Sequence, residues 1–187
     1  MVVTGTPGVG KTRLAKLLAK KFPDSELIEA NEIAKKEKCI EGRGKFGAYI
    51  VNMGKLEKKL NGLVGKSRHN VVILEGHLLC DMKIRNAVAI VLREHLKTLE
   101  KRLAKRNYSK KKIEENVTAE ATDYCGQHAE MNYQRVYELL SSDSKTLDKA
   151  ISIVIGKPPK KQNIELLSEL LALLKKKQRI RRREEAS

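Results

Sequence analysis

The hydrophobic residues of this chain gather in short continuous runs that are separated by stretches of helical periodicity. Uninterrupted apolar runs are typical of strands buried on both faces, and they occur at 71–74, 87–92 and 150–155. Shorter runs at 1–4 and 26–29 predict two further strands. Apolar residues three or four positions apart predict helices at 13–21, 31–38, 56–63, 96–103, 112–140 and 164–174. Alternation of the two element types favours an α/β domain whose five-stranded parallel sheet has helices on both faces.

A glycine-rich loop joins the first predicted strand to the first predicted helix. It reads Gly5-Thr6-Pro7-Gly8-Val9-Gly10-Lys11-Thr12 and matches the pattern Gly-x-x-x-x-Gly-Lys-Thr. In such a loop the backbone N–H groups turn toward phosphate oxygens, and the helix N-terminus adds positive potential. The lysine reaches the β- and γ-phosphates, while the threonine hydroxyl ligates Mg²⁺. We therefore expect Lys11 and Thr12 to bind a nucleotide with Mg²⁺, the alternative being a glycine-rich turn that binds nothing.

A carboxylate and a histidine follow the strand predicted at 71–74. In a phosphate-loop fold, the strand beside the first one often ends in a carboxylate that holds the Mg²⁺ shell. Glu75 occupies this position, where aspartate is more usual, and His77 follows two residues later. His77 would position a water molecule or relay a proton. A polar pair at a strand end that faces solvent is the alternative interpretation.

The charge of the chain favours a polyanionic partner. Lys and Arg total 39 against 23 Asp and Glu, so the formal net charge is +16. RNA, ribosomes and phosphorylated small molecules all fit this excess. The chain has no Trp, 2 Phe and 5 Tyr, which makes a single-strand reader built on stacked aromatic rings a poor candidate.

Other features of the composition exclude further classes. No apolar run approaches the roughly 20 residues of a membrane span, and we expect no membrane partner. The first residues show no signal-peptide pattern. The three cysteines, Cys39, Cys80 and Cys125, are odd in number and widely spaced, so a reducing interior fits better than a disulfide framework. Cys125-x-x-His128 resembles half of a zinc site, but no second pair has matching spacing, and we interpret it as structural.

Basic residues concentrate between 97 and 112. Phosphoryl transfer requires screening of charge on the transferred group, and arginines on a closing flap commonly supply it. For the lysines of this stretch, a solvated helix face is the better interpretation. For Arg106, and for Arg93 at the end of the strand 87–92, we favour a functional role.

A second basic stretch lies at the C-terminus, where seven of the nine residues from 175 to 183 are basic. It follows a helix with an apolar stripe. We expect residues 176–187 to form a disordered basic tail that meets RNA phosphates, with a solubilising end that has no partner as the equal alternative.

Several motifs in this order resemble the adenylate kinase isoenzyme 6 group of archaea and eukaryotic nuclei. They are the glycine loop, the Glu75-x-His77 pair, Val91-Leu92-Arg93, and the block Arg102-Leu103-x-x-Arg106-x-Tyr108-Ser109-x-Lys111-Lys112-Ile113-x-Glu115-Asn116. The resemblance covers residues 2 to about 175. It implies a P-loop NTPase of the nucleoside monophosphate kinase type, with a monophosphate-binding insertion at about 29–52 and a short lid at about 104–114.

The resemblance also implies an activity and partners. Members of the group resemble adenylate kinases, which convert ATP and AMP into two ADP, and ATPases. They are associated with small-subunit ribosomal RNA maturation through a small-subunit ribosomal protein. The expected location is the cytoplasm for an archaeal source or the nucleus for a eukaryotic one. An ATP-dependent ribosome assembly factor with incidental AMP phosphorylation is the alternative, and a kinase of another small molecule is a further one.

Residue by residue, the resemblance implies a donor site and a catalytic set. The residues expected to touch ATP phosphates are Gly8, Gly10, Lys11, Thr12 and Arg13. Arg106 in the lid would contact ATP, and Lys145, in the loop before the last strand, would lie near the adenine. Thr12 and Glu75 would serve Mg²⁺. The expected catalytic residues are Lys11, Glu75, His77, Arg93 and Arg106.

The chain departs from the pattern of the group at three positions. Arg13 replaces a small hydroxyl residue, and Asn107 replaces a glycine. Lys35 stands where an arginine that binds the monophosphate is expected. Lysine cannot form the bidentate pair that arginine makes with phosphate, so we expect weak monophosphate affinity.

Overall fold

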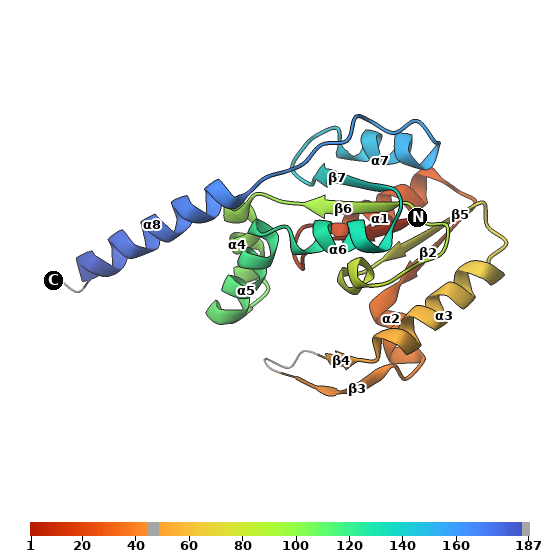
Figure 1. The fold of residues 1–187 in the computed structure, drawn as a ribbon, viewed down its shortest axis with the longest axis horizontal. Helices are drawn as coiled ribbons and strands as arrows, with labels where there is room; N and C mark the ends of the chain where they lie inside the picture. The colour runs from red at the N-terminus through yellow and green to blue at the C-terminus, as the bar shows by residue number, and fades with distance from the viewer. Residues whose placement is uncertain (45–48, 185–187) are drawn as a thin grey trace.

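A computed structural model describes residues 1–44 and 49–184 of the chain, and the side chains of residues 177 and 180–184 are not described. Its centre is a five-stranded parallel sheet in the order β2-β5-β1-β6-β7 (Figure 1). The strands are β1 (Val2–Thr4), β2 (Ser25–Glu29), β5 (Val71–Glu75), β6 (Ala89–Arg93) and β7 (Val136–Leu140). This architecture confirms the predicted α/β class.

Helices cover both faces of the sheet. They are α1 (Lys11–Lys21), α2 (Ala30–Lys36), α3 (Met53–Lys66), α4 (Leu96–Lys105), α5 (Lys110–Ala121), α6 (Tyr124–Asn132), α7 (Thr146–Val154), α8 (Leu167–Glu184) and the short 3-10 helix η2 (His77–Asp81). The hairpin of β3 (Ile40–Arg43) and β4 (Tyr49–Val51) forms a separate two-stranded sheet at the lower edge of Figure 1. It lies within the segment 29–52 that was expected to bind a monophosphate; residues 45–48 of that segment are outside the described part of the chain.

Two hydrophobic clusters hold the helices against the sheet. Successive side chains of a strand point to opposite faces, and Val2 and Val3 of the central strand accordingly enter different clusters. One cluster joins Val3 to α1, α4, α5, α7 and α8. The other joins Val2 to α2, α3, η2 and α6. The central strands are therefore continuously apolar, because helices cover both faces of the sheet.

The parallel arrangement brings the carboxyl ends of the strands to one edge of the sheet. Val3 of β1 lies opposite Glu75 of β5, one residue before β1 ends and the glycine loop begins. Arg93 ends β6 on the other side of β1, where Thr4 lies opposite Val91. Ligands of open α/β sheets bind at this edge, so the glycine loop lies where a ligand site is expected.

One strand and one helix were predicted wrongly. Residues 150–155 belong mostly to α7 and not to a strand, and the expected helix at 112–140 is divided into α5, α6 and the fifth strand β7. Short apolar runs cannot be assigned by periodicity alone. The edge strand β7 pairs only with β6 and carries the polar Glu138, so it lacks the continuous apolar run of a central strand.

The C-terminal segment also differs from the expectation of disorder. Helix α8 continues to Glu184, and Figure 1 shows it projecting away from the sheet. Its first half packs through Leu173, which is buried in the cluster that also contains α4 and α5. Residues 185–187 of the expected tail lie outside the described part of the chain.

The structure also bears on the membrane. Among residues 1–44 and 49–184, no helix combines the length and the apolar character that a bilayer crossing requires.

Replacement of Gly5 by alanine tests the close approach of the glycine loop to β6. Gly5 has a φ of +134°, and a Cβ there would overlap the carbonyl oxygen of Leu92. We expect Gly5→Ala to lower the free energy of unfolding by about 1–3 kcal/mol from backbone strain alone, measured by urea denaturation.

Gly62→Ala provides the matched control. Gly62 lies inside α3, and a Cβ added there would have no neighbour within 4 Å among the described residues. Alanine should stabilise the helix there by about 0.5–1 kcal/mol. Equal effects of the two substitutions would contradict the close approach.

Candidate nucleotide-binding site

The glycine loop adopts backbone conformations that only glycine adopts readily. Gly8 and Gly10 have φ of +97° and +111°, and Gly10 directly precedes α1. A Cβ on Gly8 would lie within 2.9 Å of side-chain atoms of Leu99 and Leu103, so the loop also packs closely on α4. The local sequence therefore specifies a tight loop that leads into the N-terminus of a helix.

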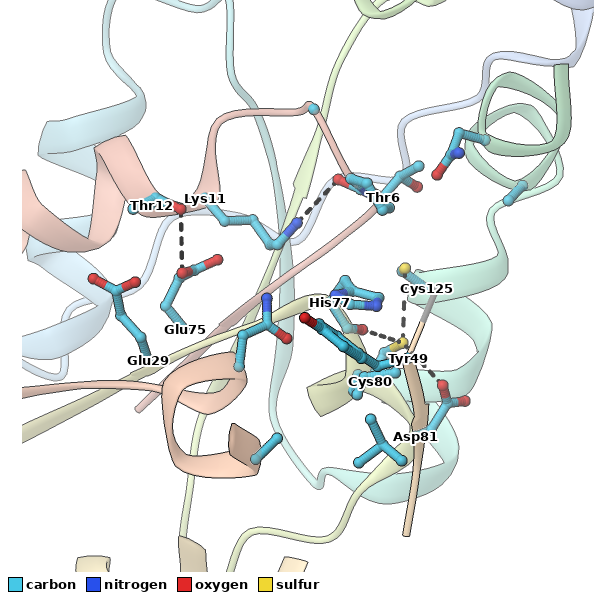
Figure 2. A pocket seen from close by; sticks show the side chains of 18 of the residues that line it. Thr6, Lys11, Thr12, Glu29, Tyr49, Glu75, His77, Cys80, Asp81 and Cys125 are labelled. Atoms are coloured by element: carbon cyan, nitrogen blue, oxygen red, sulfur yellow. Dashed lines mark hydrogen bonds between the residues drawn. The ribbon is translucent and has the colours of Figure 1, made fainter. Parts of the chain in front are cut away.

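A cavity of about 780 Å³ opens beside this loop. Its lining comes from the glycine loop, α1, α2, the β3–β4 hairpin, η2, the lid segment, α5 and α6. Figure 2 shows Lys11, Glu75 and His77 around it. Of the predicted site residues, the structure brings to this cavity Gly8, Gly10, Lys11, Thr12, Arg13, Glu75, His77 and Arg106.

Lys11 extends from the first turn of α1 into the cavity. Its Nζ donates a hydrogen bond of 3.0 Å to the carbonyl oxygen of Thr6, and the residue is 7% exposed. Burial lowers the pKa of Lys11, while the nearby carboxylate of Glu75 opposes that shift. A buried ammonium with one backbone partner retains donors for an anionic ligand.

Thr12 and Glu75 place two oxygen ligands side by side. The Thr12 hydroxyl donates to Oε2 of Glu75 at 3.1 Å (Figure 2). Burial raises the pKa of Glu75, and Lys11 acts in the opposite direction. A hydroxyl and a carboxylate are the hard oxygen donors that suit Mg²⁺.

The donor set also matches how Mg²⁺ usually binds. The described residues contain no group of three or more His, Cys, Asp or Glu side chains able to hold a metal. Mg²⁺ typically uses one or two carboxylates together with substrate phosphates and water. Thr12 and Glu75 therefore fit this ion when a nucleotide supplies the remaining ligands.

His77 begins η2 and lines the cavity. Burial, reinforced by the positive charge of Lys11, lowers the pKa of His77 to about 4. The imidazole is therefore neutral near pH 7, with one nitrogen able to donate and the other able to accept a hydrogen bond.

The structure does not bring Arg93 to this cavity. Its side chain is 1% exposed, and its Nε donates to Oε1 of Glu120 at 3.0 Å. Asp123 and Glu138 accept hydrogen bonds from the same guanidinium. Because three carboxylates occupy its donors, Arg93 is not available to ATP phosphates in this structure, contrary to the expectation from its position at a strand end.

Lys145 does not line the cavity either. It lies in the turn that follows the last strand β7, directly before α7, and not before the last strand as expected. This turn nevertheless adjoins the glycine loop, since a Cβ on Gly10 would lie 3.0 Å from Oγ of Ser141.

The segment 104–114 forms the end of α4, a turn and the start of α5. Arg106 and Tyr108 of this segment line the cavity. Asn107 has a φ of +57°, in the left-handed region where glycine is most at ease and asparagine is enriched among the other residues. The departure from glycine at this position therefore preserves the turn.

Two residues that support the loop were given no role by the sequence. Arg102 belongs to the block that carries the resemblance, and its guanidinium donates to the carbonyl oxygen of Val9 at 3.1 Å and pairs with Glu94 at 2.8 Å. Glu120 accepts a hydrogen bond of 2.5 Å from the Thr6 hydroxyl. Their importance arises from contacts across 93 and 114 residues, which no local pattern reveals.

The sheet order and the glycine loop before α1 define a P-loop nucleotide-binding protein of the α/β class. A family described as "AAA domain" matches residues 1–123, about two thirds of the 187 residues. The chain therefore belongs to this AAA domain family.

Similar curated proteins come from archaea. A protein of Pyrococcus abyssi named "Putative adenylate kinase" is 37% identical over 160 residues, which cover 83% of this chain and 82% of that protein. A protein of the same name from Methanococcus maripaludis is 30% identical over 188 residues, with 93% and 98% coverage. The predicted resemblance to adenylate-kinase-like P-loop proteins is confirmed at this level, and the isoenzyme 6 group itself stays a prediction.

Solved structures with the same fold include kinases. Shikimate kinase from Acinetobacter baumannii, solved in complex with shikimate, aligns with a TM-score of 0.58 and 13% identity, covering 85% of this chain and 94% of that chain. Shikimate kinase from Bacteroides thetaiotaomicron aligns with a TM-score of 0.51 and 18% identity, with 83% and 97% coverage. At these identities the similarity shows the fold alone.

Arg93→Met tests the buried ion network. The variant leaves Glu120, Asp123 and Glu138 without their common cation, and removing one partner of a buried pair typically costs about 3–5 kcal/mol. We expect a loss of this size in chemical denaturation. Lys161→Met is the control: its partner Glu130 is 55% exposed, and the cost should stay below about 1 kcal/mol. Equal losses of unfolding free energy in the two variants would contradict a stabilising role of the buried ion network.

The neutral state of His77 makes stability depend on pH. The folded pKa of about 4 lies below the ordinary value of 6.5, so the unfolded chain binds a proton that the folded protein does not. The contribution of neutral His77 to the free energy of unfolding is complete above about pH 6.5 and is lost as the pH falls toward 4. Relative to His77→Gln, the wild-type protein should lose about 2–3 kcal/mol of unfolding free energy between pH 7 and pH 4.5. Parallel pH profiles of the two proteins would refute this assignment.

Proposed function

We propose that the protein is a nucleoside monophosphate kinase of the adenylate kinase type, which converts ATP and AMP into two ADP. The observation that carries this proposal is a single continuous cavity. It extends from Lys11 at the glycine loop to Asn31 and Lys35 of α2 and Tyr49 of the hairpin. A phosphate donor at one end and an acceptor at the other would therefore share one space. The archaeal relatives that carry the adenylate kinase name support the same reaction.

The donor end would be formed by the glycine loop and the lid. Backbone N–H groups of Gly8, Gly10 and Arg13, with the Lys11 ammonium, would hold the phosphates of ATP. Arg106 would contact ATP from the lid, and Lys145 would lie near the adenine in the turn beside Gly10. When bound between Thr12 and Glu75, Mg²⁺ would neutralise charge on the β- and γ-phosphates.

Among the described residues, Lys35 is the cation that α2 contributes to the acceptor end, and its charge is already engaged. Nζ of Lys35 pairs with Oε1 of Glu32 at 2.9 Å, and both residues line the cavity. An AMP phosphate would have to compete with this carboxylate for the ammonium of Lys35. Because lysine also lacks the bidentate geometry of arginine, this arrangement favours weak acceptor binding.

Catalysis would rest on positioning and charge screening. Phosphoryl transfer leaves little covalent chemistry to the protein, and the acceptor phosphate of AMP needs no general base. The Lys11 ammonium, with few partners and buried in the wall, would face the oxygens on which negative charge is spread. Neutral His77 would orient water or phosphate by hydrogen bonding and would add no charge.

An ATPase that acts as a ribosome assembly factor is the second candidate. A neutral histidine beside Glu75 in the cavity favours it, because such a group can position an attacking water. The net charge of +16 is compatible with a small-subunit ribosomal protein bound to rRNA as the partner. In this case ATP turnover would not require AMP.

ATP turnover with and without AMP separates the two candidates. AMP-dependent formation of ADP as the sole product would support the kinase. Release of inorganic phosphate that is independent of AMP would support the ATPase and contradict the kinase as the main activity.

Lys11→Met tests the donor site of either activity. Removing a preorganised cation from developing charge typically costs about a hundredfold or more in turnover, and we expect a loss of this size in a coupled assay. Lys20→Met is the matched control, because Lys20 lies exposed on the same helix outside the cavity and should keep wild-type turnover. Full turnover in Lys11→Met would refute the assignment.

A further inference from the structure

Two cysteine thiols face each other in the wall of the cavity. Cys80 lies in η2 and Cys125 in the first turn of α6, and both are buried and line the cavity. Their Sγ atoms are 3.7 Å apart although the residues are separated by 45 positions (Figure 2). The tertiary fold thus forms a dithiol that the sequence spacing does not suggest.

The remaining cysteine has different surroundings. Cys39 is buried, contacts the carbonyl oxygen of Glu37 and does not line the cavity. The Cys125-x-x-His128 pair was interpreted as structural, and His128 indeed pairs with Asp81 of η2; the described residues hold no group of three or more His, Cys, Asp or Glu side chains able to bind a metal. The dithiol is therefore a separate feature, and Cys39 offers an internal control.

The two thiols are not equivalent. The single S–H of Cys80 lies within hydrogen-bond distance of three acceptors: the carbonyl oxygen of His77 at 3.1 Å, Cys125 Sγ at 3.7 Å and Asp81 Oδ2 at 3.7 Å. The hydrogen bond from Cys80 lowers the pKa of Cys125, assisted by the charge of Lys11, and the pKa of Cys80 is raised. Cys125 is consequently the better nucleophile, with Cys80 in place as the second thiol.

We propose that Cys80 and Cys125 are a modification site at which a small hydroperoxide forms a reversible disulfide, and that this bond weakens ATP binding. The cavity supplies the entry path, because both thiols line it. The second part of the inference rests on the proposed ATP site.

The reaction balances with hydrogen peroxide as the oxidant. The Cys125 thiolate attacks one peroxide oxygen, the O–O bond breaks, and hydroxide leaves and takes up a proton to become water. Cys80 sulfur then attacks the sulfenic sulfur, so that the S–S bond forms, the S–O bond breaks, and a second water leaves with the thiol proton. The two thiols lose two electrons, and one peroxide becomes two waters.

Disulfide formation would move the elements that carry the site. An S–S bond is about 2.05 Å long, so the two sulfurs must approach each other by more than about 1.5 Å. The thiol hydrogen bond from Cys80 to the His77 carbonyl would be lost. Helix α6 resists movement through Asp123, which directly precedes it and pairs with Arg93. Because η2 is also bound to α6, through Asn132 Nδ2 and the Cys80 carbonyl oxygen at 2.9 Å, the approach of the sulfurs would distort the junction of η2 and α6, and both elements line the cavity.

Peroxide treatment of the full chain tests the inference by mass and by affinity. In the wild type and in Cys39→Ser, we expect the mass to fall by two hydrogen atoms and a Cys80–Cys125 linkage to appear in a non-reducing peptide map. ATP affinity, measured by calorimetry, should weaken about tenfold, which corresponds to about 1.4 kcal/mol of binding free energy, and should recover with dithiothreitol. Saturating ATP should slow the linkage.

Cys80→Ser and Cys125→Ser should form no such linkage and should keep their ATP affinity after peroxide. Alanine variants replace them where serine lowers the melting temperature. Absence of the linkage in the wild type, or equal ATP affinity of its linked and reduced forms, would overturn the inference. A reduced wild type that binds no ATP would instead contradict the proposed function, because the linkage is measured by mass alone.

Discussion

One buried carboxylate joins the parts of the molecule that form the site. Glu120 is 1% exposed, and its Oε1 accepts hydrogen bonds from Arg93 Nε and from the backbone N–H of Glu94. Its Oε2 accepts from the Thr6 hydroxyl in the glycine loop. The central loop, the end of β6 and helix α5 therefore depend on a single charge and its partners. Buried charges persist only where they are paired and hydrogen-bonded, so this arrangement couples the shape of the loop to the packing of α5.

The contacts of Glu120 also explain why Arg93, although it ends a strand beside the glycine loop, binds carboxylates of the protein in this structure. Arg93 neutralises Glu120, Asp123 and Glu138, which come from α5, the residue before α6, and β7. Without that cation, three carboxylates would converge under the loop. Lys11 is thereby left as the buried cation of the glycine loop that faces the cavity. Because each buried charge costs desolvation free energy unless it is paired, Arg93 is paired within the protein, whereas Lys11 keeps donors for a ligand.

The same cavity wall has two kinds of chemistry. Hard oxygen donors, Thr12 and Glu75, lie on the side of α1 and β5. Soft thiols lie on the side of η2 and α6. His77 follows β5 and begins η2, and its carbonyl oxygen accepts the hydrogen bond from the Cys80 thiol. A nucleotide that fills the cavity would therefore lie beside both the oxygen donors and the thiols. A displacement of η2 at the thiols would also displace His77, which begins η2 directly after Glu75 and Gly76.

The sequence by itself determined the features that depend on local geometry. The glycine loop and the strands at 1–4, 71–74 and 87–92 could be predicted, because phosphate loops need glycine at special φ values and because strands buried on both faces are apolar. Only the tertiary structure decided which of two similar segments joins the sheet: 150–155 became α7, while 136–140 became an edge strand that tolerates Glu138. It also decided the role of Arg93 and the meeting of Cys80 with Cys125, since both depend on contacts between residues at least 27 positions apart. Pairing of buried charges and thiols is settled by packing, which no local pattern encodes.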